Sequence, residues 1–174
     1  MNYRCAFAAF AAFTIFALPG RAEISSEEHH LRLYHTHTGE RLDIVYRRGA
    51  AFIPEALARL DLFLRDHRTG DVHHFDPRLF DVLSDLITAA GRPEAEIQVI
   101  CGYRSPWSNE FLRTHTSGVA KNSLHMQAEA IDIRLPGIKT SILRNLALGL
   151  GRGGVGYYPR SDFIHVDVGR VRRW

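Results

Sequence analysis

The stretch "NSLHMQAEAIDIRL" (122–135) decides how the second half of the chain folds. Near its end, apolar and polar residues alternate as in a strand, with Asp132 between two isoleucines that point to the other side. The stretch "SDFIHVDVG" (161–169) repeats the pattern, with His165 between two aliphatic residues. Both stretches therefore predict buried strands that each carry a polar side chain.

A buried carboxylate is costly unless it is paired or binds a metal ion. His125 stands at the mouth of the first strand, so His125, Asp132 and His165 form a set suited to a zinc site with a fourth position open to water. The alternative is that Asp132 pairs with Arg134 or another arginine and that both histidines are core residues with ordinary hydrogen-bond partners. The His-x6-Asp spacing leaves both interpretations open.

Hydrolysis at such a site also needs a general base and a positive group. Asp167 shares the face of His165 on a regular strand, whereas Asp162 lies at the end of a loop and is free to turn, and the spacing does not choose between them. Arg104, in "CGYRSP", follows a strand, and its planar guanidinium suits a substrate carboxylate or an oxyanion. The alternative for Arg104 is a surface arginine on a turn.

The remaining pattern predicts an α+β fold, with one antiparallel sheet covered by helices. Alternation around a glycine turn predicts a hairpin over 30–49, and helical spacing with proline and glycine boundaries predicts the helices. We expect helices over 53–67, 76–92, 106–118 and 139–151, with Asp76 as the N-cap of the second and Pro77 at its first helical position. We also expect a strand that runs into a loop over 96–105, strands over 129–135 and 162–169, and a glycine-rich connection over 151–159.

The first 22 residues have the composition of a secretory signal: an early arginine, an apolar run over 5–18 and small residues before Glu23. The alternative is an uncleaved anchor, although the run is short for a membrane span. We therefore expect a signal peptide over 1–22, a single domain over 23–174, a periplasmic location and no stable membrane span after cleavage.

Charge and cysteine content narrow the function classes. Cleavage after residue 22 would remove two of the 22 basic residues and none of the 19 acidic ones, so the net charge of +3 argues little for nucleic acid. Cys101 is then the remaining cysteine, and we expect a small buried hydrophobe there. The basic stretch "GRVRRW" (169–174) is expected to be solvated.

Taken in order, "GYRS", Ser-Leu-His, Ala-x-Asp and a final Asp-x-x-His resemble the zinc D-alanyl-D-alanine peptidases of the lysostaphin, D-Ala-D-Ala metallopeptidase and sonic hedgehog superfamily, and within it the murein endopeptidase K-like branch. The resemblance covers roughly residues 29–170. It implies a hedgehog- and DD-peptidase-like fold, zinc ligation by His125, Asp132 and His165, Asp162 as the general base, and substrate contacts from Arg104 and Ser123.

The resemblance also implies a substrate. Such enzymes cut peptide cross-links of peptidoglycan, and this branch favours the link between two diaminopimelates. The alternatives are a D-alanyl-D-alanine carboxypeptidase and a non-catalytic wall-binding module stabilised by zinc. One departure is Ala128, where the family pattern has glycine, and we expect its methyl group to crowd a tight turn.

Overall fold

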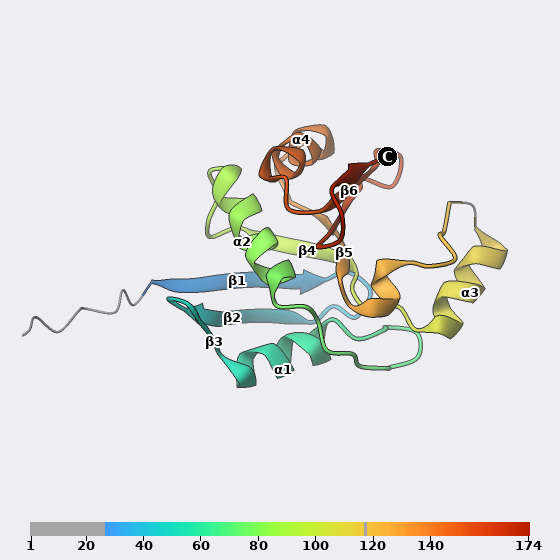
Figure 1. The fold of residues 1–174 in the computed structure, drawn as a ribbon, viewed down its shortest axis with the longest axis horizontal. Coiled ribbons are helices and arrows are strands. Elements are labelled where there is room, and N and C mark those ends of the chain that lie inside the picture. Colours follow the sequence, from blue (N-terminus) through green and yellow to red (C-terminus); the bar gives the residue numbers. More distant parts are fainter. Residues whose placement is uncertain (1–26, 117) are drawn as a thin grey trace, which may run out of the picture.

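Eight strands form one mixed sheet in the computed structural model, which describes residues 27–116 and 118–174 (Figure 1). The order across the sheet is β3-β2-β1-β4-β5-β7-β6-β8. The strands are β1 (Glu28–His35), β2 (Arg41–Arg48), β3 (Ala51–Phe52), β4 (Glu96–Cys101), β5 (Ala130–Arg134), β6 (Gly154–Tyr158), β7 (Phe163–Asp167) and β8 (Arg172–Arg173).

The α+β class is confirmed, but the sheet is not purely antiparallel. Two of its pairings, β1 with β4 and β6 with β8, are parallel. A parallel pair needs a long crossover, and here the chain passes through two helices between β3 and β4 before it returns beside β1. The predicted hairpin is present as β1 and β2, joined across a turn in which Gly39 has a positive φ of 74°.

The helices lie where their patterns predict them, with shorter ends. They are α1 (Pro54–Phe63), α2 (Arg78–Ala89), α3 (Pro106–His115) and α4 (Thr140–Leu150), with a short 3-10 helix η1 (Leu124–Gln127) that the sequence did not predict. Helix α2 begins one residue later than expected, because Pro77 occupies its N-cap position and Asp76 accepts a hydrogen bond from the backbone N–H of Arg78.

The main core lies on one face of the sheet. Helices α2 and α4 pack against each other, α2 also packs on β1, and α4 packs on β6 and β7 (Figure 1). The aliphatic residues of the central strands point into this core, and each large side chain buried there contributes about 1.5–3 kcal/mol. Fully buried examples are Leu31, Leu33, Ile97, Val99, Ile131, Ile133, Ile164 and Val166. The polar residues that alternate with them along β5 and β7 lie on the opposite face.

One prediction about the last part of the chain was wrong, because the stretch 151–159 is not only a connection but contains β6. The stretch 169–174 is largely exposed, as predicted, but it also contains β8. The glycines of β6 are there because neighbours approach closely: a Cβ on Gly156 would lie 2.7 Å from the Trp174 ring, and one on Gly154 would lie 2.4 Å from the Asp167 carboxylate.

The expected signal, residues 1–22, lies outside the described residues. Among the residues that are described, no helix has the length and apolar character needed to cross a membrane.

Candidate active site

Asp132 and His165 lie directly opposite each other on the neighbouring strands β5 and β7. His125 reaches them from η1, the single turn that precedes β5. His125 Nε2 lies 3.2 Å from Asp132 Oδ1 and 3.1 Å from His165 Nδ1, and the last two atoms are 3.0 Å apart. The structure therefore brings together one atom from each of the three residues expected to bind zinc.

This donor set fits a zinc ion. Ligand atoms about 2.0–2.2 Å from a tetrahedral zinc lie about 3.3–3.6 Å from one another, close to the spacing of these three atoms. All three side chains are buried, so a metal here would be held at a site of low dielectric. Of the alternative pairings, the one with Arg134 does not occur, because Arg134 lies 3.8 Å from Asp162 instead, but another arginine, Arg104, lies 3.8 Å from Asp132.

The other nitrogen of each histidine has its own hydrogen-bond partner. His125 Nδ1 donates to the carbonyl oxygen of Gly102 at 2.8 Å, and His165 Nε2 donates to Asp167 Oδ2 at 3.0 Å. Such partners fix the tautomer and the ring orientation of a metal-binding histidine. Asp167 is itself held by the backbone N–H of Gly154 and by the guanidinium of Arg172. Asp167 therefore orients His165, a role that the sequence, which indicated it only as a candidate general base, did not predict.

Burial and the facing carboxylate set the charges of the trio. Burial disfavours the charged form of His125, but Asp132 and Cys101 together outweigh it and raise the pKa of His125 to about 10. Burial likewise opposes ionisation of Asp132, yet His125 and His165 hold its pKa well below the ordinary value. The Asp132 carboxylate is therefore ionised at neutral pH. Its negative charge favours either a protonated histidine or a metal ion beside it.

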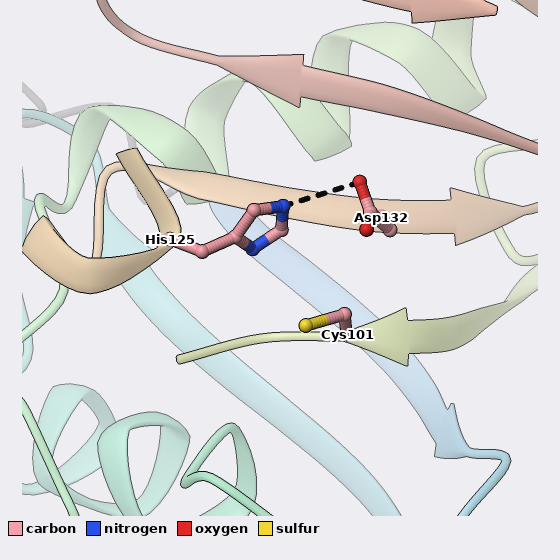
Figure 2. A group of neighbouring side chains, drawn as sticks. All are labelled: Cys101, His125 and Asp132. Carbon is pink, nitrogen blue, oxygen red and sulfur yellow. Dashed lines mark hydrogen bonds and ion pairs between the residues drawn. The ribbon is translucent and has the colours of Figure 1, made fainter. Parts of the chain in front are cut away.

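Cys101 supplies a further possible ligand (Figure 2). Its Sγ, a His125 nitrogen and an Asp132 oxygen all lie within 4.8 Å of one another, which makes a possible metal site of Cys, His and Asp. The prediction that Cys101 is buried is correct, but its thiol faces polar groups. A register shift between Val99 and Cys101 breaks the alternation of β4 and places Cys101 opposite Asp132.

The trio lies in a cavity of about 310 Å³ that Arg104 and Ser123 also line. The Arg104 guanidinium lies 3.8 Å from Asp132 Oδ2 and donates to Cys101 Sγ at 3.5 Å. Ser123 caps η1, where its Oγ accepts a hydrogen bond from the His125 backbone N–H at 3.4 Å. The residues expected to contact substrate are therefore beside the expected ligands.

Asp162 is not among the residues that line this cavity. It lies in the turn between β6 and β7 with a positive φ of 52°, its side chain is 64% exposed, and its carboxylate accepts a hydrogen bond from Thr140 Oγ1. Its chain neighbours Ser161 and Phe163 do line the cavity. The backbone thus lies at the rim while the carboxylate points elsewhere.

Sequence reasoning missed most of the other residues that line the cavity, among them Tyr158, Phe163, Arg172 and Trp174. Tyr158, Arg172 and Trp174 come from the stretches that were predicted to be a connection and a solvated end. The aromatic pair "YY" and the final tryptophan were the signals that could have been weighed, because large aromatic residues seldom lie in a purely solvated segment.

The backbone conformation of Ala128 explains why the family pattern has glycine at this position. It ends η1 in the left-handed conformation, with φ 53° and ψ 36°, which an alanine adopts at a cost of about 1–2 kcal/mol. Its side chain is fully buried against the core. The expected crowding therefore takes the form of backbone strain between His125 and β5, and the ligand geometry tolerates it.

Comparison with known proteins gives a consistent result. The model of the M15 peptidase family described as peptidoglycan L,D-endopeptidase MepK matches residues 23–174. A probable peptidoglycan L,D-endopeptidase MepK of Haemophilus influenzae is 47% identical over 137 residues, which cover 79% of this chain and 74% of that protein. The peptidoglycan L,D-endopeptidase MepK of Escherichia coli K12 is 43% identical over 144 residues, covering 83% and 79%. The chain therefore belongs to the peptidoglycan L,D-endopeptidase MepK family of M15 peptidases.

Proposed function

We propose that this protein is a zinc-dependent endopeptidase that hydrolyses peptide cross-links of peptidoglycan, with the link between two diaminopimelates as its preferred substrate. The observation that carries the proposal is the convergence of His125, Asp132 and His165 in an open cavity beside an arginine. M15 peptidases are metal-dependent, and relatives at 43–47% identity are named peptidoglycan L,D-endopeptidases.

The three ligand residues hold the metal, and their neighbours keep it in place. A zinc ion bound there would supply Lewis acidity, which polarises a carbonyl group and lowers the pKa of a water molecule. Gly102 and Asp167 fix the two imidazole rings through their outer nitrogens. Two imidazoles and one carboxylate leave room for water or substrate at a fourth position, as catalytic rather than structural zinc sites do.

Asp162 acts as the general base in this proposal. For that role its carboxylate leaves the Thr140 hydroxyl and turns over the rim toward the cavity, beside which its backbone already lies. It accepts a proton from the attacking water and later delivers it to the leaving amine. The side chain is exposed and lies in a turn, so this movement displaces no core packing.

Arg104 binds negative charge on the substrate. Its guanidinium is largely buried at the cavity wall, where a carboxylate of diaminopimelate or the developing oxyanion gains a charge-assisted hydrogen bond. Ser123 lines the same wall, and it contacts the substrate through its hydroxyl hydrogen, which the capping of η1 does not use.

Peptidoglycan as the substrate implies action outside the cytoplasm. We propose that residues 1–22 export the chain to the periplasm, in agreement with an apolar run that small residues follow. Peptidoglycan peptides are then the partner, and the nearly balanced charge of residues 23–174 gives no basis for nucleic-acid binding.

Mass spectrometry of digested sacculi tests the proposal. Purified protein should release products cut between cross-linked peptides, a chelator should abolish the release, and added zinc should restore it. Offered separately, cross-linked dimers should be cut and uncross-linked pentapeptides left intact. Release of D-Ala with dimers untouched would establish a carboxypeptidase instead, and binding to sacculi without any product would establish a wall-binding module.

A further inference from the structure

The cavity has two chemically different walls. One wall comes from the segments around β4 and η1 and carries the polar side chains of Arg104, Asn122 and Ser123 beside the apolar ones of Val119, Ala120 and Leu124. The other comes from β6, β7 and β8 and is aromatic, with Tyr158, Phe163 and Trp174. The rings of Tyr158 and Phe163 stack at 4.6 Å, and the Arg172 guanidinium lies 5.0 Å from the centre of the Trp174 ring.

Trp174 is held in this wall by several independent contacts. Its backbone extends the pairing of β8 with β6, because its N–H donates to Val155 and its carbonyl accepts from Tyr157. Its indole N–H donates to the Tyr158 hydroxyl at 2.9 Å, and its ring lies 5.1 Å from that of His165. Gly156 leaves the space that the indole fills.

The side chain of Trp174 nevertheless remains half exposed. A large apolar ring that is fixed in place but open to solvent, directly beside the three candidate ligands, is available to pack against a ligand. The charge of Arg172 is matched within the protein, since its guanidinium binds both oxygens of Asp167. Arg104 is paired more loosely, with its guanidinium 3.8 Å from Asp132 Oδ2, so negative charge on a ligand is drawn to the Arg104 wall and its apolar part to the Trp174 wall.

We propose that Trp174 is a specificity-determining residue, whose indole packs against the aliphatic chain of the substrate residue that carries the carboxylate bound by Arg104. The proposal rests on the proposed function and adds the orientation of the substrate. The substrate residue is amphiphilic, with several methylene groups and a terminal charge, as diaminopimelate has. Its aliphatic chain runs along the aromatic wall while its carboxylate crosses to Arg104.

Steady-state kinetics on a cross-linked muropeptide dimer tests this role. Trp174→Ala should lower kcat/KM by about 10- to 100-fold, mainly through KM, because burial of apolar surface is lost equally in the ground state and the transition state. Trp174→Phe should restore most of the loss, and both variants should keep wild-type metal content. The matched control is Trp107→Ala, since Trp107 is exposed on α3 and does not line the cavity.

Tryptophan fluorescence separates contact with the substrate from a purely structural role, because only contact changes the emission of Trp174 when substrate is added. The protein has two tryptophans, so Trp107→Phe leaves Trp174 as the reporter and Trp174→Phe leaves Trp107. Rapid mixing of the zinc-loaded proteins with the dimer should shift the Trp174 emission to the blue before turnover and leave the Trp107 emission unchanged.

An unchanged kcat/KM in Trp174→Ala, or a loss that follows loss of metal, would overturn the proposal while leaving the endopeptidase function intact. If the wild type cleaves no dimer, the proposed function fails. The fluorescence titration then decides on Trp174 alone, with a blue shift supporting its contact with the peptide and an unchanged spectrum refuting it.

Discussion

Two groups of histidines in this protein show what distinguishes a candidate metal site from a histidine cluster. His125 and His165 converge on the Asp132 carboxylate, with the three atoms 3.0–3.2 Å apart. His35, His37 and His67 gather near the end of β1, with ring centroids 4.1–6.1 Å apart. The rings of His37 and His67 are stacked nearly parallel, so their lone pairs do not point at one common position.

The electrostatics of the two groups are opposite. Burial lowers the pKa of His35 and of His67 to about 4, and burial also lowers the pKa of His37. Near Asp132, in contrast, the pKa of His125 is raised to about 10 despite burial. The comparison teaches that a converging buried carboxylate, rather than the number of histidines, makes a cation site.

The largest expected effect comes from removing a ligand histidine. His125→Ala and His165→Ala should abolish detectable cleavage of sacculi, because several kcal/mol of transition-state stabilisation disappear with the metal. His37→Ala, in the other histidine group, is the matched control and should stay within a few-fold of wild type. An equal loss of cleavage activity in His37→Ala would show that the two groups of histidines do not differ in function.

Asp162→Ala should keep the metal and lower turnover by about 10²–10⁴-fold, the usual cost of losing a general base. Turnover of dimers and metal content measured on the same preparation separate this from a ligand effect. Asp85→Ala, which removes an exposed carboxylate of α2 paired with Arg152, is the control. An active Asp162→Ala would show that another group takes the proton.

Asp167→Asn tests the carboxylate that orients His165. Replacing a partner of this kind typically weakens metal affinity by about 10–100-fold, and we expect a loss in that range, measured by competition with a chelator. Activity should return at saturating zinc. An inactive but fully metal-loaded variant would contradict a purely orienting role.

The smallest expected effect is the pH dependence of stability from the other histidine group. The folded-state pKa of His35 and His67 lies near 4 and the ordinary value is 6.5, so the unfolded chain binds protons first as the pH falls. The free energy of unfolding should therefore decrease between pH 6.5 and pH 4, and because solvent screens the partly exposed His67 ring we expect that group to contribute only about 1 kcal/mol. Denaturant unfolding across this range should show the slope, and His67→Gln should flatten it. A stability that is constant from pH 7 to pH 4 would refute this account.

Much of the candidate site could be predicted from local sequence, because strand alternation places Asp132 and His165 on the polar faces of buried strands. The register between β5 and β7 then places Asp132 directly opposite His165. The position of Cys101 beside His125 and Asp132 was not predicted, because a bulge in β4 reverses the direction of its side chain. Sequence alternation cannot reveal a bulge.

The aromatic wall could not be predicted for a different reason. Glycines at 153, 154 and 156 suggest a loop when only local propensity is considered. In the structure they make room for Asp167 and Trp174, which approach β6 from later in the chain. The parallel pairing of β1 with β4 is likewise a long-range contact that follows from the crossover through α1 and α2.

The most direct test of the central claim is the metal content of the purified protein and three variants, measured by elemental analysis. Wild type, His37→Ala and Cys101→Ser should each hold about one zinc per chain, because His125, Asp132 and His165 supply the ligands, whereas His165→Ala should lose it. Loss of zinc in Cys101→Ser with retention in His165→Ala would contradict the account and assign the metal to Cys101, His125 and Asp132 instead.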